Sequence, residues 1–301
     1  MGASIEEMGR TTADARRLLQ ARAPVLVRGA VKDWRAVSAW SFEYLRDRLA
    51  STILEVEAYD VVAARLEPLE LRRMTFGDYY ARLKSVSTER LFIAETDITR
   101  SVPSILNDIE VPELIPTTES SRSLLFCGVD SLTPLHYHEA EHALLCQVRG
   151  TKRLLLSSPR KTRVMRPHRW YSLRRNFSRL SVEAWANSGS IGLDLAAAEP
   201  LECVLQPGDA LFIPVHWWHA ARGIDASISV TFFWPAARSH WAFPTPGVRT
   251  FWGSKSERLL RLFGRTLSST RTIRLASCIA RWVGIVDDAA ALEADLKKGR
   301  I

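Results

Sequence analysis

Short apolar runs separated by turn residues occupy the chain between residues 121 and 235. Each run has four to eight residues, a length that is typical of buried strands when Gly or Pro stands at the ends. No long helical pattern interrupts the series, so the pattern predicts an antiparallel sandwich or barrel. The runs are "SLLFCG", "HALLCQV", "KRLLLSS", "LECVLQ", "ALFIPV" and "SISVTFFW", and the turn signals are Gly128, Gly150, Pro159, Pro207, Gly208 and Gly223.

The first 120 residues mix helical and strand patterns. A short buried strand is predicted from Val25 to Arg28, where Gly29 ends it, and alternation predicts two more strands in "TILEVEAYD" and "RLFIAET". Helical spacing appears in "TTADARRLLQAR", with Thr11 or Thr12 as N-cap, in "WSFEYLRDRL" after Ser41, and in "TFGDYYARLKS". This segment therefore adds an α/β region in front of the strand-rich region.

From about residue 249 the chain becomes helical and basic. Two apolar helix faces are predicted there, the first from Leu259, Leu262, Phe263 and Leu267, the second from Leu275, Ile279, Trp282 and Val286. We expect these faces to pack on the core or to form a homodimer, rather than to lie on a membrane. The sequence thus divides into a domain over residues 1–236 and a C-terminal helical extension over residues 237–301.

The composition adds limits to this picture. The chain has 301 residues, of which 47% are hydrophobic and 25% charged, and this balance is typical of a globular protein. It contains no run of 18 apolar residues and no basic start followed by an apolar stretch, so we expect neither a transmembrane helix nor a secretory signal. Its four cysteines form no close pair, which favours reduced thiols in a cytoplasmic protein.

Two segments concentrate metal-ligand chemistry. The stretch "TPLHYHEAEHALLCQVRG" carries His136, His138 and His142 beside Glu139 and Glu141, and "QPGDALFIPVHWWHAARG" carries His216 and His219. One histidine beside tryptophans is more often a hydrogen-bonded core residue than a ligand. A metal ion, however, needs three or four ligands that converge from different strands, and these two segments offer them. Together they predict a metal site.

The same segments resemble those of the cupin-like, JmjC-type hydroxylase family, which includes factor-inhibiting-HIF and tRNA wybutosine hydroxylases. The resemblance runs from about residue 20 to 236 and includes "APVLVRGAVKDWRAVSAWSFEYLRDRL". It implies a mainly β fold with flanking helices, a double-stranded β-helix or jelly-roll barrel. It also implies that Fe(II) and 2-oxoglutarate bind in the mouth of the barrel.

Residue by residue, the resemblance assigns roles to five positions. His136 matches the first histidine ligand and His219 the last. Lys152 matches a lysine that pairs with the far carboxylate of 2-oxoglutarate, and Thr133 matches a hydroxyl that assists it. Thr231 stands where relatives often carry Asn. The implied function is an Fe(II)- and 2-oxoglutarate-dependent dioxygenase that hydroxylates a C–H bond of a protein, an RNA or a small molecule.

The third ligand departs from the family pattern of His-x-Asp. Counted forward from His136, the aspartate position holds His138. Counted backward from "QVRG", the chain has one extra residue and Glu139 takes that position, unless a bulge reconciles the two. We favour a triad of His136, His138 and His219; Glu139 and Glu141 remain alternatives, and His142 is the first reserve.

An all-histidine face carries one negative charge fewer than the family's site. It should neutralise Fe(II) less well and make Zn(II) a competitor. Two other hypotheses therefore stay open. One is a metal-binding cupin with chemistry that does not use 2-oxoglutarate, and the other is a non-catalytic interaction module.

A strongly basic segment follows the first histidine cluster. No acidic residue occurs between Glu141 and Glu183. The segment from 149 to 179 holds eleven cations: Arg149, Lys152, Arg153, Arg160, Lys161, Arg163, Arg166, Arg169, Arg174, Arg175 and Arg179. Trp170, Tyr171 and Phe177 interleave with them. The pattern favours an acidic or phosphate-bearing partner, which includes nucleic acid, although a solvated loop would look the same.

Overall fold

The chain is described here from a computed structural model that covers residues 5–9, 17–60, 70–84, 89–116, 121–170, 172, 174–243 and 246–253. Strands dominate these residues, so the predicted mainly β class is confirmed. The strands are β1 (Glu6–Met8), β2 (Val25–Val27), β3 (Ile53–Asp60), β4 (Glu70–Thr75), β5 (Glu89–Asp97), β6 (Arg122–Val129), β7 (Leu132–His136), β8 (Glu141–Arg149), β9 (Lys152–Ser157), β10 (Leu201–Leu205), β11 (Ala210–Ile213), β12 (Trp218–Gly223) and β13 (Ala226–Pro235).

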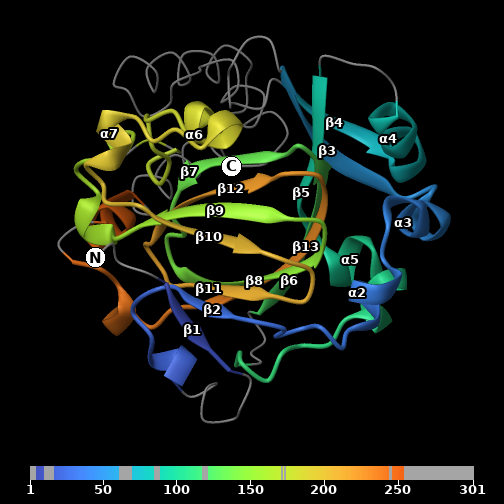
Figure 1. Ribbon diagram of the computed structural model, residues 1–301, viewed down its shortest axis with the longest axis horizontal. Coiled ribbons are helices and arrows are strands. Elements are labelled where there is room, and N and C mark those ends of the chain that lie inside the picture. The colour runs from blue at the N-terminus through green and yellow to red at the C-terminus, as the bar shows by residue number, and fades with distance from the viewer. Residues whose placement is uncertain are drawn as a thin grey trace, which may run out of the picture.

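The helices are short and lie outside the strands (Figure 1). They are α2 (Arg35–Ala39), α3 (Phe42–Leu49), α4 (Phe76–Leu83), α5 (Ile98–Ser101), α6 (Glu183–Ser188) and α7 (Leu193–Ala196), with 3₁₀ helices η1 (Pro103–Asp108), η2 (Pro159–Lys161) and η3 (Arg238–His240). Two predicted helices are confirmed, and the predicted start after Ser41 is among the caps that begin them. The Ser41 hydroxyl accepts the Tyr44 N–H at the start of α3, and the Thr75 hydroxyl accepts the Asp78 N–H at the start of α4.

Two sheets make up the strand-rich region. The larger has the order β1-β2-β11-β8-β13-β6-β5-β3-β4, and the smaller has the order β10-β9-β12-β7. All the pairings are antiparallel except the one between β1 and β2. The eight strands from β6 to β13 divide evenly between the sheets, an arrangement consistent with the expected jelly-roll barrel.

Three apolar clusters hold these layers together. The interior cluster joins side chains of both sheets, such as Leu145 and Phe233 from the larger and Leu154 and Leu156 from the smaller. A second cluster packs α2 to α5 on the outer face of the larger sheet, and a third packs α6 and α7 on the smaller sheet. The barrel interior is therefore closed on both sides, and polar groups that face it are shielded from water.

Several predictions can be placed on this structure. The six apolar runs correspond to β6, β8, β9, β10, β11 and β13, whereas β7 and β12 were not predicted as strands. The three cysteines at 127, 146 and 203 are free and buried, as expected. In the described part of the chain no helix is long and apolar enough to cross a membrane. The predicted helices beyond residue 253, the homodimer contact through them, and Thr11 and Thr12 lie outside the described residues.

Candidate metal centre

Three of the predicted ligands meet inside the barrel. One ring nitrogen from each of His136, His138 and His219 lies within 4.8 Å of the others. The ring centroids of His136 and His219 are 4.2 Å apart, and those of His138 and His219 are 4.5 Å apart. Three imidazoles at this separation can share one divalent cation.

The pairing of β7 with β12 creates this meeting. His136 at the end of β7 lies directly opposite His219 on β12. The next paired positions are Thr133 and Ala221, so β7 contains one residue more than β12 in this interval. Without a bulge, residues three positions apart on a strand point to opposite faces of the sheet. The extra residue of the bulge turns them toward the same face. Thr133 and His136 therefore both face the interior.

Backbone carbonyls hold two of the rings in the orientation that a ligand needs. His136 Nδ1–H donates to the Pro134 carbonyl at 2.8 Å, and His219 Nδ1–H donates to the Trp217 carbonyl at 2.9 Å. Each bond leaves the Nε2 lone pair free, as in many metal-binding histidines. His138 Nδ1 is buried and has no hydrogen-bond partner among the described residues. A bound metal ion would satisfy this orphaned nitrogen.

Burial keeps the three imidazoles neutral. Desolvation lowers the pKa of His136 below its usual value, and it lowers the pKa of His138 and His219 well below. The neighbouring rings lower the pKa of His138 further, because two protonated imidazoles would repel each other. At neutral pH each of the three rings therefore keeps one nitrogen with a free lone pair that can bind a metal ion.

The other residues considered as third ligand are engaged elsewhere. Both oxygens of Glu139 accept from buried Arg175 at 2.7 Å, and Glu141 pairs with Arg122 at 2.7 Å. His142 accepts the Val215 N–H on Nδ1, so its Nε2–H donates to His240. The structure thus brings His138, rather than these three, to His136 and His219.

His216 stabilises the fold through hydrogen bonds and lies outside the histidine triad. Its Nδ1 accepts the Ala242 N–H at 3.0 Å, and its Nε2–H donates to the Glu139 carbonyl at 2.9 Å. The ring therefore ties the turn after β7 to the segment after η3. Its backbone φ of +68° is rare for a residue with a side chain and is maintained by these contacts.

Lys152 is a buried cation inside the barrel. Its side chain hydrogen-bonds Ser229 on the opposite sheet, and the ammonium lies 5.9 Å from the Phe126 ring centroid. Among the described residues no carboxylate pairs with it. Burial lowers its pKa from 10.5 to about 8. Thr231 stands two residues beyond Ser229 on the interior face of β13, where it is also buried.

A cavity of about 510 Å³ opens beside the histidines. His136, His138, Thr133 and Phe126 line it from the barrel. Arg174, Asn176 and Phe177 line it from the basic segment. The Phe177 ring stacks on His136 with ring centroids 5.4 Å apart, and Ser178 N–H donates to the Leu135 carbonyl along β7. The basic segment therefore borders the mouth of the barrel, next to the histidines.

Two carboxylates that sequence reasoning missed complete the cavity wall. Glu57 on β3 and Glu95 on β5 both line it, and among the described residues neither has an ion-pair partner. Tyr59 donates its hydroxyl to Glu57. Desolvation raises the pKa of both carboxyl groups. Glu95 sits in a β-bulge with a φ of +53°, a strained geometry that often marks a functional position.

Three cations of the basic segment are neutralised by carboxylates of the described residues. Arg175 pairs with Glu139, Lys161 with Glu199 and Arg166 with Asp194. The Arg153 guanidinium lies over the Trp185 ring. The segment divides into structural cations and a few that face cavities. An acidic or phosphate-bearing partner of the segment stays a prediction.

Comparisons with known proteins agree with this architecture. A profile described as the cupin-like domain matches residues 11–240. "Lysine-specific demethylase 8" of Xenopus tropicalis is 28% identical over 228 residues, which cover 70% of this chain and 48% of that protein. "Jumonji C domain-containing protein 5" of Drosophila melanogaster is 25% identical over 238 residues, covering 71% of this chain and 55% of that protein.

A third relative differs more in length. "tRNA wybutosine-synthesizing protein 4" of Aspergillus oryzae is 27% identical over 225 residues, which cover 70% of this chain and 21% of that protein. The chain thus spans about half the length of the first two relatives and much less of the third. The matched profile covers most of the chain and the whole of the barrel with its histidines. The chain belongs to the cupin-like domain family.

Proposed function

We propose that this protein is an Fe(II)- and 2-oxoglutarate-dependent oxygenase, and that its substrate places a cationic group in the cavity beside the metal. The single observation that carries the proposal is the buried Lys152 ammonium. It faces the same barrel interior as the three histidines and has no acidic partner among the described residues.

An uncompensated buried charge is costly, and a protein retains it where a ligand supplies the opposite charge. The cavity next to the histidines leaves room for a small anion. A dicarboxylate such as 2-oxoglutarate would suit this interior, because one end could chelate a metal ion while the other pairs with the lysine, which lies beside the cavity-lining Phe126. The resemblance to JmjC-type hydroxylases assigns this same task to Lys152.

The protein's own groups then have defined tasks. His136, His138 and His219 would hold the metal, and the carbonyls of Pro134 and Trp217 keep two of the rings in the ligating tautomer. Phe177 and Phe233 pack on the rings of His136 and His138 and exclude water from that side. When bound, iron and 2-oxoglutarate supply the oxidising chemistry that couples O₂ to C–H hydroxylation.

The cavity wall supports the cationic substrate. Glu57 and Glu95 would both pair with a positive group, since desolvation raises their pKa and a cation beside them would favour the charged carboxylates. One relative is named as a lysine-specific demethylase, and a lysine or arginine side chain has the required charge and reach. Peptides that contain Lys or Arg are therefore the first substrates to test.

A second function has its own support. Three neutral imidazoles are also a good site for Zn(II), and they lack the carboxylate of the usual iron triad. A metal-binding cupin whose chemistry does not use 2-oxoglutarate would keep the histidines but would have no need for Lys152.

The deciding experiment is an anaerobic titration of the Fe(II)-loaded protein with 2-oxoglutarate, monitored by visible absorption. A weak charge-transfer band that grows to one equivalent is expected. In the variant Lys152→Met the band should need far more 2-oxoglutarate, while the iron content stays the same. Iron retention without any band would reject the oxygenase and favour the second function.

Substrate class is tested separately by succinate formation in air. Peptides with a central Lys or Arg should stimulate it more than peptides with Glu at that position. Glu95→Gln should remove this preference, whereas Glu110→Gln, which lies outside the cavity, should keep it. Equal stimulation by all peptides would reject the cationic substrate.

A further inference from the structure

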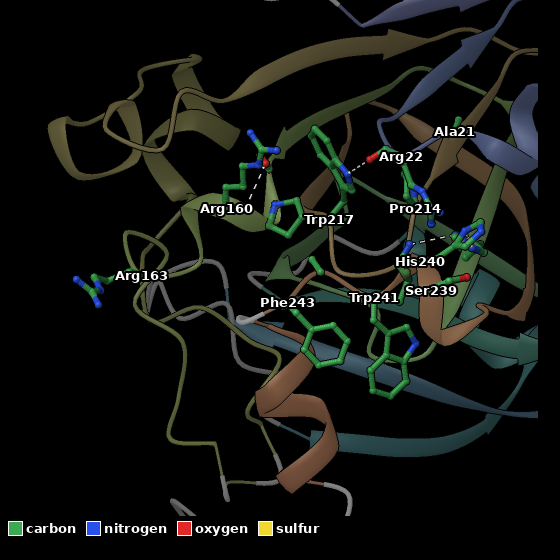
Figure 2. A pocket seen from close by; sticks show the side chains of 15 residues that line it. Ala21, Arg22, Arg160, Arg163, Pro214, Trp217, Ser239, His240, Trp241 and Phe243 are labelled. Carbon is green, nitrogen blue, oxygen red and sulfur yellow. Dashed lines mark hydrogen bonds between the residues drawn. The ribbon is translucent and has the colours of Figure 1, made fainter.

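A second and larger cavity lies away from the metal centre. Its volume is about 890 Å³, which is within the range of small-molecule sites. Arg22, Arg160 and Arg163 line it together with Trp217, Trp241 and Phe243 (Figure 2). It shares no lining residue with the cavity beside the histidines. The described residues that line it include no carboxylate, and its polar side chains besides the three arginines are those of Ser158, Ser239, His142 and His240.

The three arginines of this cavity form no ion pair with the described residues. Arg22, Arg160 and Arg163 have exposed side chains and no ion-pair partner within the described residues. This sets them apart from Lys161, Arg166 and Arg175 of the same basic segment, which are paired. Figure 2 shows Arg163 pointing outward at the rim, while Arg160 and Arg22 stand close to Trp217. The positive field of Arg22 lowers the pKa of His142 and His240 at the cavity wall, after the larger effect of burial.

Aromatic rings supply the rest of the wall. Trp241 and Phe243 are stacked with ring centroids 6.3 Å apart, and the Phe243 side chain is 59% exposed. Trp217 is held by a 2.8 Å hydrogen bond from its Nε1–H to the Arg22 carbonyl. An exposed phenylalanine beside a stacked tryptophan leaves aromatic surface open to a planar ligand.

The geometry points to a binding site for a nucleoside monophosphate. Unpaired guanidinium groups recognise phosphate, and the aromatic rings offer surfaces on which a nucleobase can stack. Neither the arginines nor the aromatic rings alone define the ligand. Inorganic phosphate would leave the rings uncovered, and a neutral aromatic compound would leave the arginines unpaired. This inference is independent of the proposed oxygenase activity, since the two cavities have separate walls.

The test is calorimetric titration of the full chain with AMP, adenosine and inorganic phosphate, at physiological salt and after removal of metal by EDTA. AMP should bind one to one and more tightly than either fragment. Arg160→Gln should weaken AMP binding about tenfold through loss of a charge-assisted contact. Phe243→Ala should weaken it about fivefold or more through loss of stacking.

Two exposed positions outside the cavity provide matched controls. Arg100→Gln removes the same charge, and Trp252→Ala removes an exposed aromatic ring; both should leave AMP binding unchanged. Absence of AMP binding, or equal weakening in the controls, would overturn the assignment. So would displacement of AMP by 2-oxoglutarate with metal, because the nucleotide would then occupy the other cavity. Binding of a single-stranded RNA oligonucleotide without binding of AMP would also overturn it and would indicate a nucleic-acid surface.

Discussion

Replacement of Lys152 by methionine should stabilise the ligand-free protein while it weakens 2-oxoglutarate binding. Burial lowers the pKa of the ammonium from 10.5 to about 8, which corresponds to about 3 kcal/mol for keeping the charge at pH 7. Methionine fills a similar volume without charge, and loss of the hydrogen bond to Ser229 costs about 1 kcal/mol. A net gain of about 2 kcal/mol would raise Tm by about 4 to 8 °C.

The pH dependence of this gain follows from the direction of the pKa shift. Below the folded-state pKa of about 8 the lysine is charged in both states, and the folded state carries the full penalty. As the pH rises from 8 toward 10.5, the folded-state lysine loses its proton first, and the penalty disappears. The Tm advantage of Lys152→Met over the wild type should therefore be constant below pH 8, shrink as the pH rises, and reverse sign near pH 10.5, where only the loss of the hydrogen bond to Ser229 remains.

The affinity for 2-oxoglutarate should fall in Lys152→Met, although the stability of the ligand-free protein rises. The wild-type ammonium pairs with a carboxylate of 2-oxoglutarate, and removal of one partner of a buried ion pair costs at least about 2 kcal/mol, or a 30-fold rise in Kd. Thermal denaturation with and without 2-oxoglutarate, in the presence of Fe(II) without oxygen, measures both effects. A variant that is less stable at pH 7 and binds 2-oxoglutarate as the wild type does would refute the reasoning.

Three further substitutions test the remaining assignments. His219→Ala should lower metal affinity by more than about 100-fold in metal analysis, since even outer-shell changes reach that size. His240→Ala, outside the triad, should retain the metal. Glu139→Gln should lower the free energy of unfolding by about 3 kcal/mol, because it removes the carboxylate charge that binds the buried Arg175 guanidinium. Its metal content should stay at the wild-type level, and a loss of metal would identify Glu139 as a ligand. Glu95→Gln should weaken binding of a Lys- or Arg-containing peptide about tenfold, measured by calorimetry, because one charged hydrogen-bond partner is lost; unchanged affinity would remove Glu95 from the substrate site.

The third ligand illustrates where sequence reasoning reached its limit. Forward and backward counting placed His138 and Glu139 at the same position, and a bulge was the condition for reconciling them. The structure has a bulge in β7, but it precedes His136 rather than following it. The choice is made by Arg175, which lies far along the chain and binds Glu139. No local pattern around "LHYHEAEH" contains that information.

The strands that carry the histidines were also hard to predict. The segment of β7 contains a proline, and that of β12 consists of "WHAARG", without a β-branched residue. Both lie in the smaller sheet, where cross-strand pairing rather than intrinsic propensity stabilises them. The apolar runs of β8, β9, β11 and β13 were recognised because these strands are buried on both faces and read as continuous hydrophobic stretches.

The mainly β class, the positions of six barrel strands, the helix start at Ser41 and the residue types that can bind a metal ion could all be read from the amino-acid sequence. These properties depend on neighbours within a few positions, through side-chain alternation and hydrogen bonds at helix ends. The tertiary structure was needed to show which histidines meet, that Lys152 has no acidic partner among the described residues, that Glu57 and Glu95 line one cavity, and that Arg22 and Arg160 line a second. These are contacts between distant segments, and their geometry depends on how the two sheets pack and where β7 and β5 bulge.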